Sequence, residues 1–184
     1  MKTILRSLVV LSFILCPSIL HASKVVSVAA GERHSVALTD EGKVWAWGAN
    51  GSGQVGDGTT DDRLNPVRVL LPSAATGYFD DAAAIAAGTA YWLNFGGHTV
   101  ILRKDGTVWG CGYNNDGELG DGSQISRTPV VQVNNPADPS GYLADVKSVG
   151  AGAIHTLAVM KDGTLRAWGY NGYGQLGNGS TSGS

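Results

Sequence analysis

Short stretches of alternating hydrophobic and polar residues, separated by glycine-containing turns, recur along this chain. In the first stretch His34, Val36 and Leu38 share one face of a predicted strand, because side chains on a strand alternate between its two faces. The turn 39–42 ends in a glycine that suits a positive φ angle, and a second strand follows at 44–47. The pattern therefore predicts a β-hairpin.

This hairpin and the glycine-rich segment after it occur three times, at 31–58, 97–122 and 152–179. The first two copies continue into strands that we expect to begin with proline, at Pro66 and Pro129. With an entry strand before each hairpin, the pattern predicts about four short antiparallel strands per unit, an all-β fold and no helix. The expected boundaries are 24–70 for unit one, 82–133 for unit two and 145–184 for unit three, which ends before its proline-led strand.

The two faces of the second strand of each hairpin differ in character. One face carries small or medium residues, whereas the other carries Trp45 with Trp47 in the first unit. The matching pairs are Trp109 with Cys111 and Arg166 with Trp168. A position that alternates between Trp and Arg cannot be buried throughout, so we expect Trp45, Trp109 and Arg166 near the rim, and Trp47 and Trp168 in the core.

Cys111 is smaller than the tryptophans at its equivalent positions and is expected to leave space unfilled. The same unit contains an extra segment, 89–96, that carries Tyr91, Trp92 and Phe95. Our hypothesis is that one of these aromatic side chains fills that space.

Residues 1–22 have the layout of a secretory signal peptide. Lys2 and Arg6 make a positive start, an apolar run spans 8–16, and a cleavage site is predicted after Ala22. The run is shorter than the roughly 20 apolar residues of a membrane span. We therefore expect a secreted or periplasmic protein, with no membrane association once the leader is removed.

Composition supports one globular domain, because 43% of the 184 residues are hydrophobic. Loss of the leader removes two positive charges and no negative ones, so the net charge moves from −2 to −4. A mildly acidic chain without a basic block is a poor nucleic-acid binder. The mature chain retains one cysteine, which cannot form an internal disulfide, so its stability must come from packing.

The repeated positions resemble those of the regulator of chromosome condensation repeat family. This resemblance implies a β-propeller, usually of seven blades, of which this chain has about three. The ring would then be incomplete, and either self-association or further blades beyond residue 184 would complete it. The matching positions are Gly31, His34, 40–42, Trp47, Gly48, Asn50, 53–54, Gly56, Gly58, Pro66, Gly97, His98, Gly112, Asn114, 117–120, Pro129, Gly152, His155, Trp168, Gly169, Asn171 and 174–177.

None of the recurring polar residues indicates a catalytic, metal-binding or nucleotide-binding site. His34, His98 and His155 recur with the repeat, as structural residues should, and no further metal ligands lie near them in the sequence. The GxGxxG matches at 51–56 and 172–177 lack a following helix, so we interpret them as turns. We expect no cofactor, no metal and no catalysis. Trp47, Trp168, Gly48, Gly112 and Gly169 complete the expected structural set.

The favoured function is an exported protein-binding scaffold that presents loops from one propeller face to a protein partner. Aromatic residues dominate binding hot spots, and those that vary between units form the predicted contact set. Inhibition of a secreted enzyme is one alternative. Nucleotide exchange on a small GTPase is another, implied by the resemblance but opposed by the leader. The contact set consists of Tyr78, Phe79, Tyr91, Trp92, Phe95, Tyr142 and Tyr173.

Overall fold

The computed structural model describes residues 23–71, 73–74, 76–89, 96–135 and 141–183, which form three antiparallel sheets. We call the sheets blades 1, 2 and 3. Blade 1 contains β1 (Val25–Ala30), β2 (His34–Thr39), β3 (Val44–Gly48) and β4 (Arg63–Arg68). Blade 2 contains β5 (Ala82–Ala87), β6 (His98–Arg103), β7 (Val108–Gly112) and β8 (Arg127–Gln132). Blade 3 contains β9 (Val146–Ala151), β10 (His155–Met160) and β11 (Leu165–Gly169).

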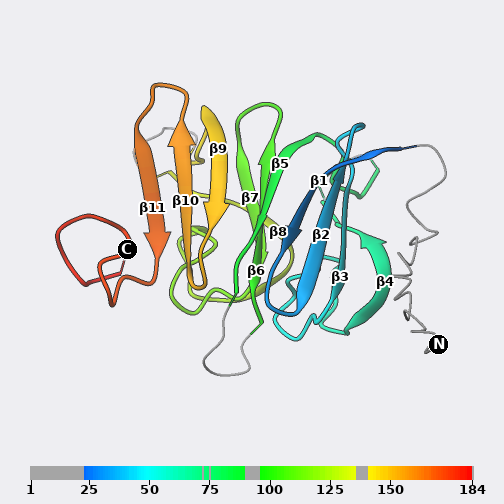
Figure 1. Cartoon of the computed structure of the whole chain (residues 1–184), viewed down its shortest axis with the longest axis horizontal. Helices are drawn as coiled ribbons and strands as arrows, with labels where there is room; N and C mark the ends of the chain where they lie inside the picture. The colour runs from blue at the N-terminus through cyan, green and yellow to red at the C-terminus, as the bar shows by residue number, and fades with distance from the viewer. Residues whose placement is uncertain (1–22, 72, 75, 90–95, 136–140, 184) are drawn as a thin grey trace, which may run out of the picture.

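Strands follow one another across each blade in chain order. The blades are joined through their first strands, because β5 contacts β1, β2 and β9, and β9 also contacts β6. Figure 1 shows the three sheets standing side by side. This is the arrangement of β-propeller blades, and the prediction of an all-β fold with about three blades of antiparallel strands is confirmed. In the described part of the chain no helix is long and apolar enough to cross a membrane.

The strands run between two ends of the molecule that differ in their connections. The turn end, uppermost in Figure 1, carries the tight turns 40–43, 104–107 and 161–164. The loop end carries the glycine-rich segments that follow β3, β7 and β11. The turn glycines Gly42, Gly106 and Gly163 have φ angles of 83°, 90° and 86°, as expected from their place in the hairpins.

The outer strands begin earlier than the sequence suggested. β4 starts at Arg63 and β8 at Arg127, which lie opposite Gly48 and Gly112 on the neighbouring strands. Pro66 and Pro129 therefore lie inside strands that we expected them to start. The outermost strand of a sheet tolerates proline, because an amide there need not donate to a further strand.

Two hydrophobic clusters fill the spaces between the blades, one between blades 1 and 2 and one between blades 2 and 3. Trp168 is buried in the second cluster, with 9% of its surface exposed. Trp47, in contrast, is only half-buried, so its prediction as a core residue was wrong. In the described part of the chain no sheet precedes blade 1 to cover it. Trp45 and Trp109 are half-buried and Arg166 is exposed, in agreement with their expected place near the rim.

Candidate functional site

One asparagine in each blade organises the glycine-rich segment at the loop end. In blade 3 the Nδ2 group of Asn171 donates to Asn178 Oδ1, Ser180 O and Ser182 O, at 2.7 to 3.1 Å. Its Oδ1 atom accepts from Leu176 N at 2.9 Å. Asn50 and Asn114 make the matching set of bonds in blades 1 and 2. The blade 3 segment thus keeps the conformation of the other two segments although no fourth strand follows it in the described chain.

The fourth strand is held in blades 1 and 2 by an ion pair that blade 3 lacks. Asp57 pairs with Arg63 at the start of β4, and Asp121 pairs with Arg127 at the start of β8, the latter at 2.8 Å. Burial alone would raise the pKa of Asp121, but hydrogen bonds from Ser123 and Arg127 hold it below its usual range. Blade 3 has the neutral Asn178 at this position.

Strand β11 has an open edge in the described part of the chain. In the other blades that edge is covered, as Val133 N donates to Val108 O at 2.9 Å across the β7–β8 pair. The bonds from Met160 N to Thr164 O and from Tyr170 N to Ile154 O show which backbone groups of blade 3 face β10. Because backbone direction alternates along a strand, the amides and carbonyls of Leu165 and Ala167 point to the open side. The carbonyl of Gly169 points the same way but lies beside Gly183, since a Cβ atom on Gly183 would be 3.2 Å from it.

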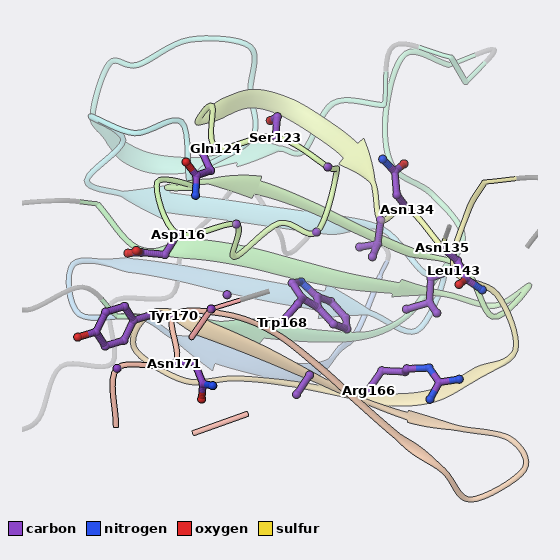
Figure 2. A pocket seen from close by; sticks show the side chains of 18 of the residues that line it. Asp116, Ser123, Gln124, Asn134, Asn135, Leu143, Arg166, Trp168, Tyr170 and Asn171 are labelled. Carbon is purple, nitrogen blue, oxygen red and sulfur yellow. The ribbon is translucent and has the colours of Figure 1, made fainter. Parts of the chain in front are cut away.

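A groove of about 1070 Å³ runs along this open edge. Residues 166–169 of β11 form one wall, and blade 2 supplies the other, which includes Gly120, Val133 and Leu143. Figure 2 shows Trp168 between the two walls, with Tyr170 and Asp116 toward one end and Arg166 and Leu143 toward the other. The groove therefore combines unpaired backbone groups with apolar side chains, namely Val133, Leu143 and Trp168, set among polar ones. It lies where β4 and β8 lie in the other blades.

Trp168 is fixed against the blade 2 wall by hydrogen bonding and by close packing. Its indole Nε1 donates to the carbonyl of Glu118 at 2.8 Å. A Cβ atom on Gly120 would lie 2.8 Å from the same nitrogen, and Gly120 has a φ of +61°. Only glycine satisfies both the close approach and the positive φ here.

Glu118 is a buried carboxylic acid that the sequence analysis did not single out. It occupies the position of Gln54 and Gln175, whose Oε1 atoms accept a backbone N–H from residues 52 and 173. The Oε2 atom of Glu118 accepts the matching bond from Asp116 N at 3.0 Å, whereas its Oε1 atom has no partner. Burial raises the pKa of Glu118 to about 7. The available signal was the Gln–Glu–Gln series at one repeat position.

The histidines link neighbouring blades through a threonine. His34 Nε2 lies 3.0 Å from Thr99 Oγ1, which donates to Gln54 O at 2.7 Å. The same chain joins His98, Thr156 and Glu118 O at 3.0 and 2.8 Å. Burial lowers the pKa of His34 to about 4 and, with a contribution from the other histidines, that of His98 to about 3. Both imidazoles are therefore neutral near pH 7 and act as hydrogen-bonding links between blades.

The predicted aromatic contact set is divided between the two ends of the molecule. Tyr78 and Tyr142 follow the outer strands at the turn end and are 41% and 45% exposed. Tyr173 lies at the loop end and is 89% exposed. No single face of the described chain therefore presents all of them.

Phe79 corrects the prediction, because its side chain is fully buried. It packs edge-on against Trp109 of the next blade, with ring centroids 6.1 Å apart, and belongs to the core. Tyr91, Trp92 and Phe95 lie outside the described residues, so their predicted contacts and the proposed filling of the space beside Cys111 stay predictions.

Cys111 lies between blades 1 and 2, with its Sγ atom 3.6 Å from Gln54 O. Burial raises the pKa of this thiol to about 12, so it is protonated and unreactive near neutral pH. Within the described ranges no three metal-ligating side chains lie together.

Comparison with known proteins identifies similar chains. The Arabidopsis thaliana ultraviolet-B receptor UVR8 is 32% identical over 160 residues, which cover 87% of this chain and 32% of the receptor. Human WBSCR16 superimposes with a TM-score of 0.68 at 26% identity, over 88% of this chain and 38% of that one. Prp20p from Saccharomyces cerevisiae, studied for its binding to Gsp1p and histones, superimposes with a TM-score of 0.66 at 26% identity, over 86% and 36%. This chain thus spans about a third of the length of these relatives.

Two family models match the repeats directly. Both describe the regulator of chromosome condensation (RCC1) repeat, one at residues 25–54 and 146–175, the other at 41–91 and 105–159. Together they cover His34, His155 and most of the three blades, whereas residues 92–104, which include His98, lie between the matched ranges. The chain belongs to the regulator of chromosome condensation repeat family.

Proposed function

We propose that this chain is an exported, non-catalytic protein-binding scaffold, and that its main binding site is the groove along β11. The observation that carries the proposal is the open edge of that strand, which faces a wall from blade 2 that contains the apolar side chains Val133 and Leu143. Exposed sheet edges bind extended polypeptides by adding them as a further strand. The preferred partner segment is therefore extended and runs antiparallel to β11.

The outer strands of blades 1 and 2 indicate what such a segment needs. Val67 and Val131 lie opposite Ala46 and Gly110 in the two complete blades, and Ala167 holds the equivalent position in blade 3. An apolar side chain at the matching place in a partner would lie beside Ala167. Since Asn178 replaces the carboxylates of the other blades, a basic residue at the start of the segment is not required.

The family supports protein binding as the general role, because Prp20p has been studied for binding to Gsp1p and histones. Tyr78, Tyr142 and Tyr173 would extend the contact area at the two ends of the blades. The signal-like residues 1–22 support export. Amino-terminal sequencing of the protein recovered from outside the cytoplasm should begin at Ser23, and recovery of the intact chain from the cytoplasm alone would contradict export.

A synthetic peptide of residues 127–133 tests the groove, because this segment fills the equivalent position in blade 2. The labelled peptide should bind the chain saturably in fluorescence anisotropy. N-methylation at the position of Val133 removes the donor that bonds Val108 O in blade 2 and would bond Leu165 O here. Loss of that bond should weaken binding roughly tenfold.

The matched control is the same peptide with its N-methyl group at the position of Gln132, whose amide points away from the neighbouring strand. It should bind as tightly as the unmodified peptide. No saturable binding of the unmodified peptide, or equal weakening by both N-methyl groups, would contradict strand addition at β11.

A further inference from the structure

Each junction between blades is a two-part contact, which we call the latch. The leading blade supplies what we call the acceptor half, named for its backbone carbonyl. This half also contains a glycine with positive φ and a histidine whose Nε2–H donates to the threonine oxygen, because the threonine's own proton goes to the carbonyl. The following blade supplies the donor half, which is a threonine hydroxyl and one further side chain. At the first junction Thr99 and Cys111 both approach Gln54 O, and at the second Thr156 and Trp168 both approach Glu118 O. The latch occurs between blades 1 and 2 and again between blades 2 and 3.

Blade 1 carries a donor half that has no acceptor in the described chain. Ser35 follows His34 as Thr99 and Thr156 follow their histidines, and Trp47 holds the position of Trp168. Both Ser35 and Trp47 are half-buried. Within the described ranges neither the Ser35 hydroxyl nor the Trp47 indole N–H has a hydrogen-bond partner.

Blade 3 carries the complementary acceptor half, formed by His155, the carbonyl of Gln175 and Gly177. A Cβ atom on Gly56 would lie 2.9 Å from Cys111 Sγ, whereas one on Gly177 would meet nothing within 4 Å. Gly177 nevertheless keeps the backbone conformation of Gly56, with φ angles of +66° and +72°. The acceptor half thus keeps its conformation, and no described residue contacts it at Gly177.

The sheet face beside this acceptor half is apolar. Val44 and Val108 are fully buried under the following blade, whereas Leu165 at the same position in blade 3 is 57% exposed. Leu157 and Val159 on β10 are half-buried, although their equivalents in the other blades are buried. This face is the opposite one from Trp168 and the groove, so its occupant need not compete with a strand added to β11.

We propose that blade 1 of one copy of this chain docks on blade 3 of a second copy, head to tail, through the same latch. The Ser35 hydroxyl and Trp47 Nε1 of one copy donate to the Gln175 carbonyl of the other. His155 then bonds the Ser35 hydroxyl, as His34 bonds Thr99. A second copy fits because both halves, with their donors and acceptors in the required places, are present on one chain. Such a contact joins unlike surfaces and is therefore heterologous.

Sedimentation velocity of the full chain over a range of concentrations tests the proposal. The wild-type chain should associate, and Trp47→Ala and Gly177→Asn should each sediment as monomers. Asparagine tolerates a positive φ, so Gly177→Asn fills the space meant for Trp47 without forcing the backbone to change. Gly77→Asn is the matched control, because Gly77 has a φ of +71° and open space around it but lies away from the latch. It should associate as the wild-type chain does.

Mixing the two monomeric variants gives the most specific outcome. Trp47→Ala retains an intact acceptor half and Gly177→Asn an intact donor half, so an equimolar mixture should form one-to-one dimers. All variants keep residues 1–22, and association through that segment would persist in each of them. A monomeric wild-type chain, association that survives both substitutions, or a mixture that stays monomeric would overturn the proposal.

Discussion

The two junctions between blades share one hydrogen-bonding chain but differ in what fills the space around it. The histidine–threonine distance is 3.0 Å at both junctions, and the threonine–carbonyl distances are 2.7 and 2.8 Å. At the first junction Cys111 reaches the carbonyl only weakly, at 3.6 Å, whereas at the second Trp168 donates to it at 2.8 Å. The hydrogen-bonded chain therefore has the same geometry at both junctions, whichever side chain lies beside it.

The outer parts of the two junctions also differ, because the junction with the smaller side chain is closed and the one with the larger side chain is open. The first junction has the smaller Cys111 but is sealed by Val130 of β8 and by Trp109, which meets Phe79. The second has the larger Trp168 but no strand beyond β11 in the described chain, and the groove opens there. Trp168 thus carries a larger share of the packing at its junction than Cys111 does.

Replacing Trp168 with alanine should give the largest loss of stability. The side chain is buried and donates a hydrogen bond to Glu118 O, so we expect Trp168→Ala to cost about 3–5 kcal/mol of unfolding free energy. Cys111→Ala removes one sulfur atom from a closed junction and should cost about 1 kcal/mol. Urea denaturation of both variants measures the difference, and equal losses would contradict the comparison.

Replacing Glu118 with glutamine should stabilise the chain at alkaline pH. A carboxyl whose pKa is raised to about 7 in the folded state, from 4.5, keeps its proton there while the unfolded state loses it. Stability from this group therefore falls as pH rises from 4.5 to 7, by roughly 3 kcal/mol at most. Glu118→Gln should gain up to about that amount at pH 8 and little at pH 4.

The buried histidines have the opposite dependence and do not obscure this result. Their folded-state pKa values lie below the ordinary 6.5, so the stability that they contribute is present above pH 6.5 and is lost as pH falls toward 4. The wild-type and Glu118→Gln proteins both retain these histidines. The difference between their unfolding free energies therefore reports the contribution of the Glu118 carboxyl alone. A difference that does not change between pH 4 and pH 8 would show that Glu118 is ionised normally in the folded chain.

Replacing the latch threonines with valine should have a smaller effect, similar at both junctions. Thr99→Val and Thr156→Val each remove the hydroxyl that joins a histidine to a carbonyl, which we expect to cost about 1–2 kcal/mol. Thr164→Val, at an exposed turn, is the control and should cost less. Thermal unfolding of the three variants measures these losses. A lower melting temperature for only one of Thr99→Val and Thr156→Val would contradict an equal role for the two latches.

Much of the fold was predictable because the repeat displays it three times. Turn glycines such as Gly42 are identified by their spacing, and period-two alternation identifies the strands. The burial of Trp47 could not be predicted in the same way, since it depends on a neighbouring blade rather than on its own strand. Phe79 was misjudged for a related reason, because its aromatic ring packs on Trp109 from a different unit.

The groove was even less accessible to sequence reasoning. It lies along the open edge of β11, and its opposite wall comes from blade 2, a different unit of the chain. Glu118 was overlooked because glutamate and glutamine appear alike in a turn motif until burial makes the carboxyl distinctive. For both the groove and Glu118, the differences between the three copies at equivalent positions were the only signal in the sequence.

Hydrogen exchange at the amide of Ala167 tests the open edge of β11 most directly. In blades 1 and 2 the equivalent residues, Ala46 and Gly110, pair with the outer strand. The Ala167 amide should therefore exchange far faster than those two in the free chain, and should become protected when the peptide of residues 127–133 is added. Exchange at Ala167 as slow as at Gly110 without the peptide, or unchanged by it, would contradict an open, strand-binding edge.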